Sequence, residues 1–92
     1  MSDIYWRKLF IVYVLKSINY KYHYIGHTKD LNVRLKQHNM GRVKVSKARS
    51  PFIVIYQEEY QLRSEAVKRE RQFKKGEGNI WLRNKLINLN LW

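Results

Sequence analysis

The chain has 92 residues, with 19 Lys and Arg against 7 Asp and Glu, a formal net charge of +12, and no cysteine. This length excludes a second independent core, so we expect one domain over residues 1–92. The missing cysteines exclude disulfides and thiolate metal sites and fit a cytoplasmic location. The charge favours a polyanionic partner, and nucleic acid before a membrane, because the basic residues are not gathered on one amphipathic helix.

The first element expected is a strand over residues 9–15, apolar on both faces and therefore central in a sheet. Residues 1–8 lack the apolar core of a signal peptide, and residues 9–15 are too few to cross a bilayer. A polar turn over residues 16–21 and a strand over residues 22–26 predict an antiparallel hairpin. A turn centred between residues 18 and 19 would pair Tyr13 directly with Tyr24.

A helix is expected over residues 31–39, with Asp30 as its cap and Gly41 as its stop. Its periodicity places four side chains on one face: Leu31, Arg34, Leu35 and His38. Residues 42–50 carry four basic residues and no acid, and are expected to form an exposed loop.

The second half of the chain predicts one more strand and two helices. The strand follows Pro51 over residues 52–56 and can extend to residue 60. Ser64 is expected to cap a helix over residues 65–75, and Asn79 a last helix to residue 86. Trp81 and Trp92 are expected in core and terminal packing. The prediction is an α+β fold in the order β-β-α-β-α-α, a small three-stranded antiparallel sheet flanked by helices.

Several segments of the chain, in order and at these spacings, resemble the GIY-YIG nuclease family. They are Val12-Tyr13-Val14-Leu15, Tyr24-Ile25-Gly26-His27-Thr28, Arg34-Leu35, His38-Asn39, Pro51-Phe52, Glu65-Ala66, Arg69-Glu70 and Lys74-Lys75-Gly76. The resemblance is greatest to the small single-domain branch related to the nuclease domain of the bacterial excision-repair nuclease, a DNA-repair enzyme. The chain departs from the motif at Ile11, which replaces the first glycine.

The resemblance implies a metal-dependent endonuclease that hydrolyses phosphodiester bonds, in DNA before RNA. Low sequence specificity is expected because a chain this short shows no obvious second DNA-reading domain. Tyr13 and Tyr24 match the paired motif tyrosines, and Tyr13 is favoured as the phenol that orients or deprotonates water. Arg34 matches the arginine on the scissile phosphate. His38 matches a position used for phosphate contact or proton transfer. Glu70 matches the metal-binding glutamate.

A cofactor and further contacts with nucleic acid are also expected. The family resemblance places one Mg²⁺ or Mn²⁺ ion on Glu70, with Glu65 as the rival ligand. A single glutamate is sufficient because such ions bind one or two protein carboxylates and take water and phosphate oxygens as their other ligands. Gly26 is expected to give the backbone room near the substrate. The phosphate contacts expected from the basic loop are Lys44, Lys47 and Arg49.

Other interpretations of these residues stay open at this point. The tyrosines fit cross-strand packing, Arg34 a solvated helix, and Glu70 a surface ion pair. His23 and His27 are interpreted as surface residues. The domain can be a non-cleaving nucleic-acid-binding module, or an interaction protein that uses its aromatic residues. We expect a monomer or weak homodimer, with a protein partner as a possible source of specificity.

Overall fold

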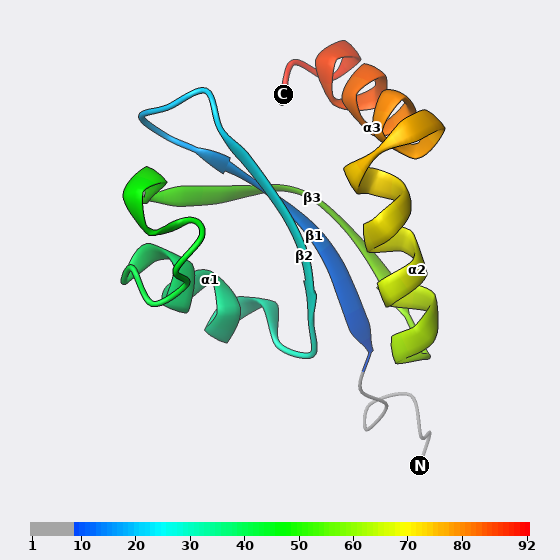
Figure 1. The fold of residues 1–92 in the computed structure, drawn as a ribbon, viewed down its shortest axis with the longest axis horizontal. Coiled ribbons are helices and arrows are strands. Elements are labelled where there is room, and N and C mark those ends of the chain that lie inside the picture. The colour runs from blue at the N-terminus through cyan, green and yellow to red at the C-terminus, as the bar shows by residue number, and fades with distance from the viewer. Residues whose placement is uncertain (1–8) are drawn as a thin grey trace.

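The computed structural model describes residues 9–92, so the expectation for residues 1–8 lies outside the described part of the chain. One three-stranded antiparallel sheet has the strand order β2-β1-β3. Helix α1 covers one face of this sheet, and α2 with α3 covers the other (Figure 1). The elements are β1 (Phe10–Ser17), β2 (His23–Thr28), α1 (Leu31–Asn39), a short 3-10 helix η2 (Lys47–Arg49), β3 (Phe52–Tyr60), α2 (Arg63–Lys74) and α3 (Gly76–Asn88).

The expected α+β class and element order are confirmed by this arrangement. No helix within residues 9–92 is long and apolar enough to cross a bilayer.

The central strand β1 divides the core into two parts. Val12 and Val14 are fully buried against α2 and α3, while Tyr13 and Leu15 are buried on the α1 side. Side chains alternate across a strand, so a segment apolar on both faces is stable only with a layer on each side. The prediction of a central, doubly covered strand is confirmed.

A bulge in β3 lets this strand contribute to both cores. The pairing with β1 shifts between Val14, which faces Tyr56, and Leu15, which faces Val54, so Ile55 is the extra residue. Residues before the bulge contact the α1 side, and residues after it pack on the α2 side. Without the extra residue, the alternation of the strand would send both sets of side chains to one face.

The predicted register of the hairpin is wrong by two residues. Tyr13 pairs with Gly26, and Tyr24 pairs with Leu15. The strands extend further than their apolar residues indicate, because Lys16 and His23 are still paired and β1 continues to Ser17. Both tyrosines nevertheless remain on the same face, since a shift of two residues preserves the alternation.

The caps of the last two helices also differ from the prediction. Helix α2 begins at Arg63, before Ser64, and the Glu65 carboxylate accepts a 3.1 Å hydrogen bond from the backbone N–H of Leu62. Glu65 therefore performs the capping expected of Ser64, as in the carboxylate half of a capping box.

Helix α3 begins at Gly76, three residues before its expected cap. Gly76 has a φ of 69°, a left-handed conformation suited to glycine, and turns the chain between α2 and α3. The Asn79 amide instead donates a 2.8 Å bond to the carbonyl of Phe73 near the end of α2. Asn79 thus joins the two helices rather than starting the second.

The two C-terminal tryptophans differ in environment. Trp81 is 44% exposed, which corrects its assignment to the core, although its ring stacks on Phe73 at 6.1 Å. Trp92 stacks on His23 with ring centroids 3.6 Å apart, as expected for terminal packing. Helix α3 reaches the core through Leu82 and Leu86.

A polar cluster joins β3 to α2. The Glu58 carboxylate accepts hydrogen bonds of 2.6 Å from both Tyr56 and Tyr60, and pairs with Arg69 at 2.8 Å. Burial opposes ionisation of Glu58, but the bonds from Arg69 and the two phenols outweigh it and lower the pKa of this carboxyl. The lowered pKa means that ionised Glu58 stabilises the folded state.

We therefore expect Glu58→Gln to reduce the free energy of unfolding at neutral pH by about 1.5–3 kcal/mol, because it weakens charge-assisted bonds. The contribution is present above the ordinary glutamate pKa of 4.5 and is lost as pH falls through the lower folded-state value. Urea unfolding at several pH values measures it, with exposed Glu59→Gln as the control. Equal losses in both variants would contradict this role of Glu58.

Candidate active site

The two motif tyrosines lie together over a glycine. The rings of Tyr13 and Tyr24 are stacked, with centroids 6.1 Å apart. A Cβ on Gly26 would lie 2.8 Å from the Tyr13 hydroxyl and 2.9 Å from the Tyr24 ring. These distances are too short for a real contact, so Gly26 provides the space that the phenols occupy. Tyr13 on β1 and Tyr24 on β2 are diagonal neighbours across the two strands, so their phenol rings lie side by side.

A buried hydrogen-bond chain starts at Tyr13. Its hydroxyl lies 3.0 Å from His38 Nε2, and His38 Nδ1 lies 2.8 Å from Ser46 Oγ. Ser46 in turn donates to the carbonyl of Val43 at 3.4 Å. A neutral imidazole has one N–H, so every group is satisfied when Nδ1 donates to Ser46 and Nε2 accepts from Tyr13. Tyr13 is therefore a donor in this arrangement.

Burial keeps both ends of this bond neutral. Burial, helped by the charge of Arg34, lowers the pKa of His38 to about 4. Burial raises the pKa of Tyr13 to about 12, although the Arg34 guanidinium acts in the opposite direction. At neutral pH the pair is an uncharged imidazole and an uncharged phenol. Neither group is a ready acid or base on its own in this state.

The basic loop over residues 42–50 is mostly exposed, as expected. It also contains η2, and it buries Ser46, which bonds His38. The side chains of Lys44, Lys47 and Arg49 are exposed, as expected for that loop. Sequence patterns could not find the role of Ser46, because a buried serine between basic residues has no periodic signal.

Arg34 extends from α1 toward the two phenols. It lies on the partly buried side of α1 with His38, as the helical spacing predicts. Its guanidinium donates a 2.9 Å bond to Gln37. Interaction with the Tyr13 hydroxyl raises the pKa of Arg34, so this side chain is a permanent cation. It is a suitable group for bidentate binding of phosphate.

Glu70 lies on α2, on the other side of β2. Its carboxylate contacts His27 Nδ1 at 2.7 Å and Lys74 Nζ at 2.6 Å. Burial disfavours the charged form, but the bonds from Lys74 and His27 outweigh it and lower the pKa of Glu70. Glu70 is therefore an ionised oxygen donor at neutral pH.

The interpretation of His27 as a plain surface residue is wrong. Its side chain is only 24% exposed and bonds Glu70. A signal was present in the sequence, since His27 follows the motif glycine and must point to the face opposite Gly26. The distant Glu70 could not be assigned to that face before the register was known.

The five expected catalytic residues approach β2 from both faces of the sheet. Tyr13, Tyr24, Arg34 and His38 lie on the α1 side and Glu70 on the α2 side. Glu70 is close enough for its charge to contribute to the raised pKa of Tyr13. Since β2 is an edge strand, groups on its two faces can act on one ligand that lies along that edge.

A concavity of about 330 Å³ lies between the end of β2 and α1, and we call it the β2–α1 concavity. Four of its side chains are basic or imidazole groups, and its one acid, Asp30, caps α1 through the N–H of Val33. Tyr13 and His38 are buried and do not line it. The lining consists of His27, Thr28, Lys29, Asp30, Val33, Arg34, Gln37 and Arg63.

The described residues offer few ligands for a metal. Residues 9–92 contain no group of three or more His, Cys, Asp or Glu side chains that could hold an ion. Glu70 fits a site with a single carboxylate, because it is ionised and its partner Lys74 is half exposed. Such a site suits Mg²⁺, which keeps several waters and uses substrate phosphates as ligands.

Comparison with known proteins agrees with this fold and these motifs. The sequence model of the GIY-YIG catalytic domain matches residues 9–84. The chain therefore belongs to the GIY-YIG family, whose fold is of the nuclease type and whose members typically use a divalent metal. A domain of this type implies binding of nucleic acid.

Curated relatives are found in Staphylococcus aureus. The UPF0213 proteins of strains Mu3, Mu50 and N315 are each 46% identical to this chain over 52 residues. The match covers 55% of this chain and 63% of each relative, so it spans less than two thirds of their length. No solved structure matches the chain.

The neutral state of His38 makes folding stability depend on pH. The unfolded-state pKa is 6.5 and the folded-state value is about 4, so the unfolded chain takes up the proton first. Stability is therefore retained above pH 6.5 and falls between pH 6.5 and 4, by on the order of 3 kcal/mol.

We expect this fall to be absent in His38→Gln, which replaces the imidazole with an amide that can still donate and accept hydrogen bonds but cannot titrate. Urea unfolding of both proteins across this pH range gives the difference that belongs to His38. The same pH dependence in wild type and variant would contradict a buried neutral imidazole.

Proposed function

We propose that the protein is a metal-dependent endonuclease that hydrolyses phosphodiester bonds, in DNA in preference to RNA. One observation carries the proposal. Along a single edge strand, a permanent cation, Arg34, borders a cationic concavity, and an ionised carboxylate, Glu70, lies behind His27. Metal-assisted hydrolysis of a phosphodiester uses a cation that binds the phosphate and an oxygen ligand that holds the metal.

The scissile phosphate would lie in the β2–α1 concavity. Arg34, His27 and Lys29 line this space, and Asp30 is engaged in capping. Arg34 would bind two phosphate oxygens and balance the charge that develops in the transition state. These groups read the sugar-phosphate backbone rather than base edges, which supports low sequence specificity.

Glu70 would hold the metal through the oxygen that now accepts from Lys74. The half-exposed lysine can rotate away, whereas His27 remains on the other oxygen and fixes the carboxylate. The bound ion supplies charge stabilisation to the phosphoryl oxygens and the leaving alkoxide. Glu65, the rival ligand, is engaged at the start of α2, which disfavours it.

The phenols would have different roles. Tyr13 is 1% exposed and donates to His38, so it positions its neighbours rather than meeting water. Tyr24 is half-buried beside Arg34 and is the phenol that can contact the attacking water. Tyr24 would therefore take the water-orienting role for which the sequence favoured Tyr13.

A non-cleaving nucleic-acid-binding module on the same fold is the second candidate. The net charge of +12 supports it equally well. The two candidates differ at Glu70, because a binding module gains nothing from a carboxylate near phosphates. We therefore expect metal-dependent products only from an endonuclease.

We expect Glu70→Gln and Arg34→Gln each to reduce nicking of supercoiled plasmid in Mg²⁺ at least about 100-fold, since each removes a transition-state contact. Glu65→Gln is the matched control and should keep most of the activity. The assay compares each protein with and without Mg²⁺.

Full activity of a pure Glu70→Gln preparation would refute the metal site. Binding without any metal-dependent product from the wild-type protein would favour the binding module.

A further inference from the structure

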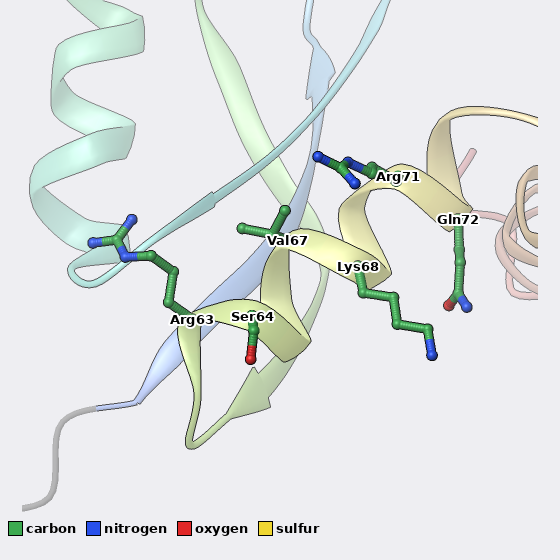
Figure 2. Close-up of a pocket in the computed structure, with 6 residues that line it drawn as sticks. All are labelled: Arg63, Ser64, Val67, Lys68, Arg71 and Gln72. Carbon is green, nitrogen blue, oxygen red and sulfur yellow. The ribbon is translucent and has the colours of Figure 1, made fainter.

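A second cationic groove runs along α2 and shares only Arg63 with the β2–α1 concavity. We call it the α2 groove, and it follows two adjacent rows of the helix at four-residue spacing (Figure 2). Arg63, Val67 and Arg71 form the row that points toward the strands in this view. The complete lining is Arg63, Ser64, Val67, Lys68, Arg71 and Gln72.

Within the described part of the chain, residues 9–92, the cations of this groove have no acidic partner. On the same helix, Arg69 pairs with Glu58 and Lys74 pairs with Glu70. Among residues 9–92, no ion pair involves Arg63, Lys68 or Arg71, and all three are exposed. Unpaired cations that follow one groove destabilise the isolated fold and favour a polyanion as occupant.

Arg63 connects this groove to the proposed cleavage site. It lines both the α2 groove and the β2–α1 concavity. Its guanidinium lies 5.1 Å from the centre of the Phe10 ring, and Lys29 Nζ lies 5.5 Å from the same ring. Lys29 and Arg63 both line the β2–α1 concavity, so an anion bound there can interact with both cations.

We propose that the α2 groove binds the backbone of the nucleic acid beyond the cleavage site, through phosphate contacts of Arg63, Lys68 and Arg71. This inference rests on the proposed function for its starting point at the β2–α1 concavity. Eight residues separate Arg63 from Arg71, a rise of about 12 Å along the helix, or roughly three phosphates of one strand. The contacts are independent of sequence.

The position of the groove favours this path over the basic loop. Neither Lys44, Lys47 nor Arg49 lines the β2–α1 concavity, whereas Arg63 does. The loop and α2 lie on opposite sides of the sheet (Figure 1). A strand that leaves the concavity past Arg63 therefore continues along α2.

Salt-dependent binding tests the proposal without requiring catalysis. We would measure the anisotropy of a fluorescein-labelled DNA duplex in EDTA, over a series of salt concentrations. Lys68→Gln with Arg71→Gln should reduce the salt slope by about 1.8 and weaken binding roughly tenfold or more. The control with the same charge change is Lys21→Gln with Arg83→Gln, at exposed positions outside the groove.

An unchanged slope in the groove variant, or the same reduction in the control, would overturn the proposal. Binding of the wild-type protein to anionic phosphatidylserine vesicles but not to the duplex would also overturn it. Loss of the slope in the groove variant, in a protein without metal-dependent cleavage, would support the groove and refute only the endonuclease. Metal-dependent cleavage by the wild-type protein, with an unchanged salt slope in the groove variant, would support the endonuclease and refute only the groove.

A crosslinking experiment locates the contact directly. Because the chain has no cysteine, Ser64→Cys introduces one unique attachment point in the groove for a photoreactive maleimide. Asn19→Cys, exposed in the β1–β2 turn, is the control. We expect a covalent protein–DNA adduct only from the groove variant. An adduct formed only by the control variant would overturn the proposal.

Discussion

The space above Gly26 is the constraint on which the candidate site depends. Two phenol rings occupy the volume that any side chain at this position would need. Because both rings share this space, Tyr13 stacks on Tyr24, and the Tyr13 hydroxyl hydrogen-bonds to His38. The motif glycine therefore serves the packing of two tyrosines, in addition to any room it leaves for a substrate.

The polar groups of the site are organised by burial. Tyr13, His38 and Ser46 form a neutral chain in which each buried donor has an acceptor, so burying them costs little. The charged groups, Arg34 and Glu70, lie where solvent or a ligand can reach them. The fold thus separates groups that position from groups that can touch a phosphate.

The edge strand explains why residues from opposite faces can cooperate. His27 and Gly26 are neighbours in β2 but face opposite sides of the sheet. His27 faces α2, and Gly26 faces the α1 side. A phosphate lying along this edge would meet Arg34 from one layer and a metal ion on Glu70 from the other. Among residues 9–92, Arg63, Lys68 and Arg71 of α2 form no ion pair, and Arg63 also lines the β2–α1 concavity.

Much of the fold followed from local patterns. The doubly apolar strand, the Asp30 cap and the face shared by Arg34 and His38 depend on periodicity and near neighbours. The register of the hairpin depended on the rings over Gly26, and the His27–Glu70 pair on contacts 43 residues apart. Such long-range packing has no periodic signal, so the sequence alone misplaced the hairpin and passed over His27.

The most direct test of a single site at this edge is a titration with paramagnetic Mn²⁺, followed by nuclear magnetic resonance. Line broadening should appear on both faces of β2, at Tyr24 and Arg34 as well as at His27, and should disappear in Glu70→Gln. Broadening limited to the α2 face, or equal broadening without the Glu70 carboxylate, would contradict the account.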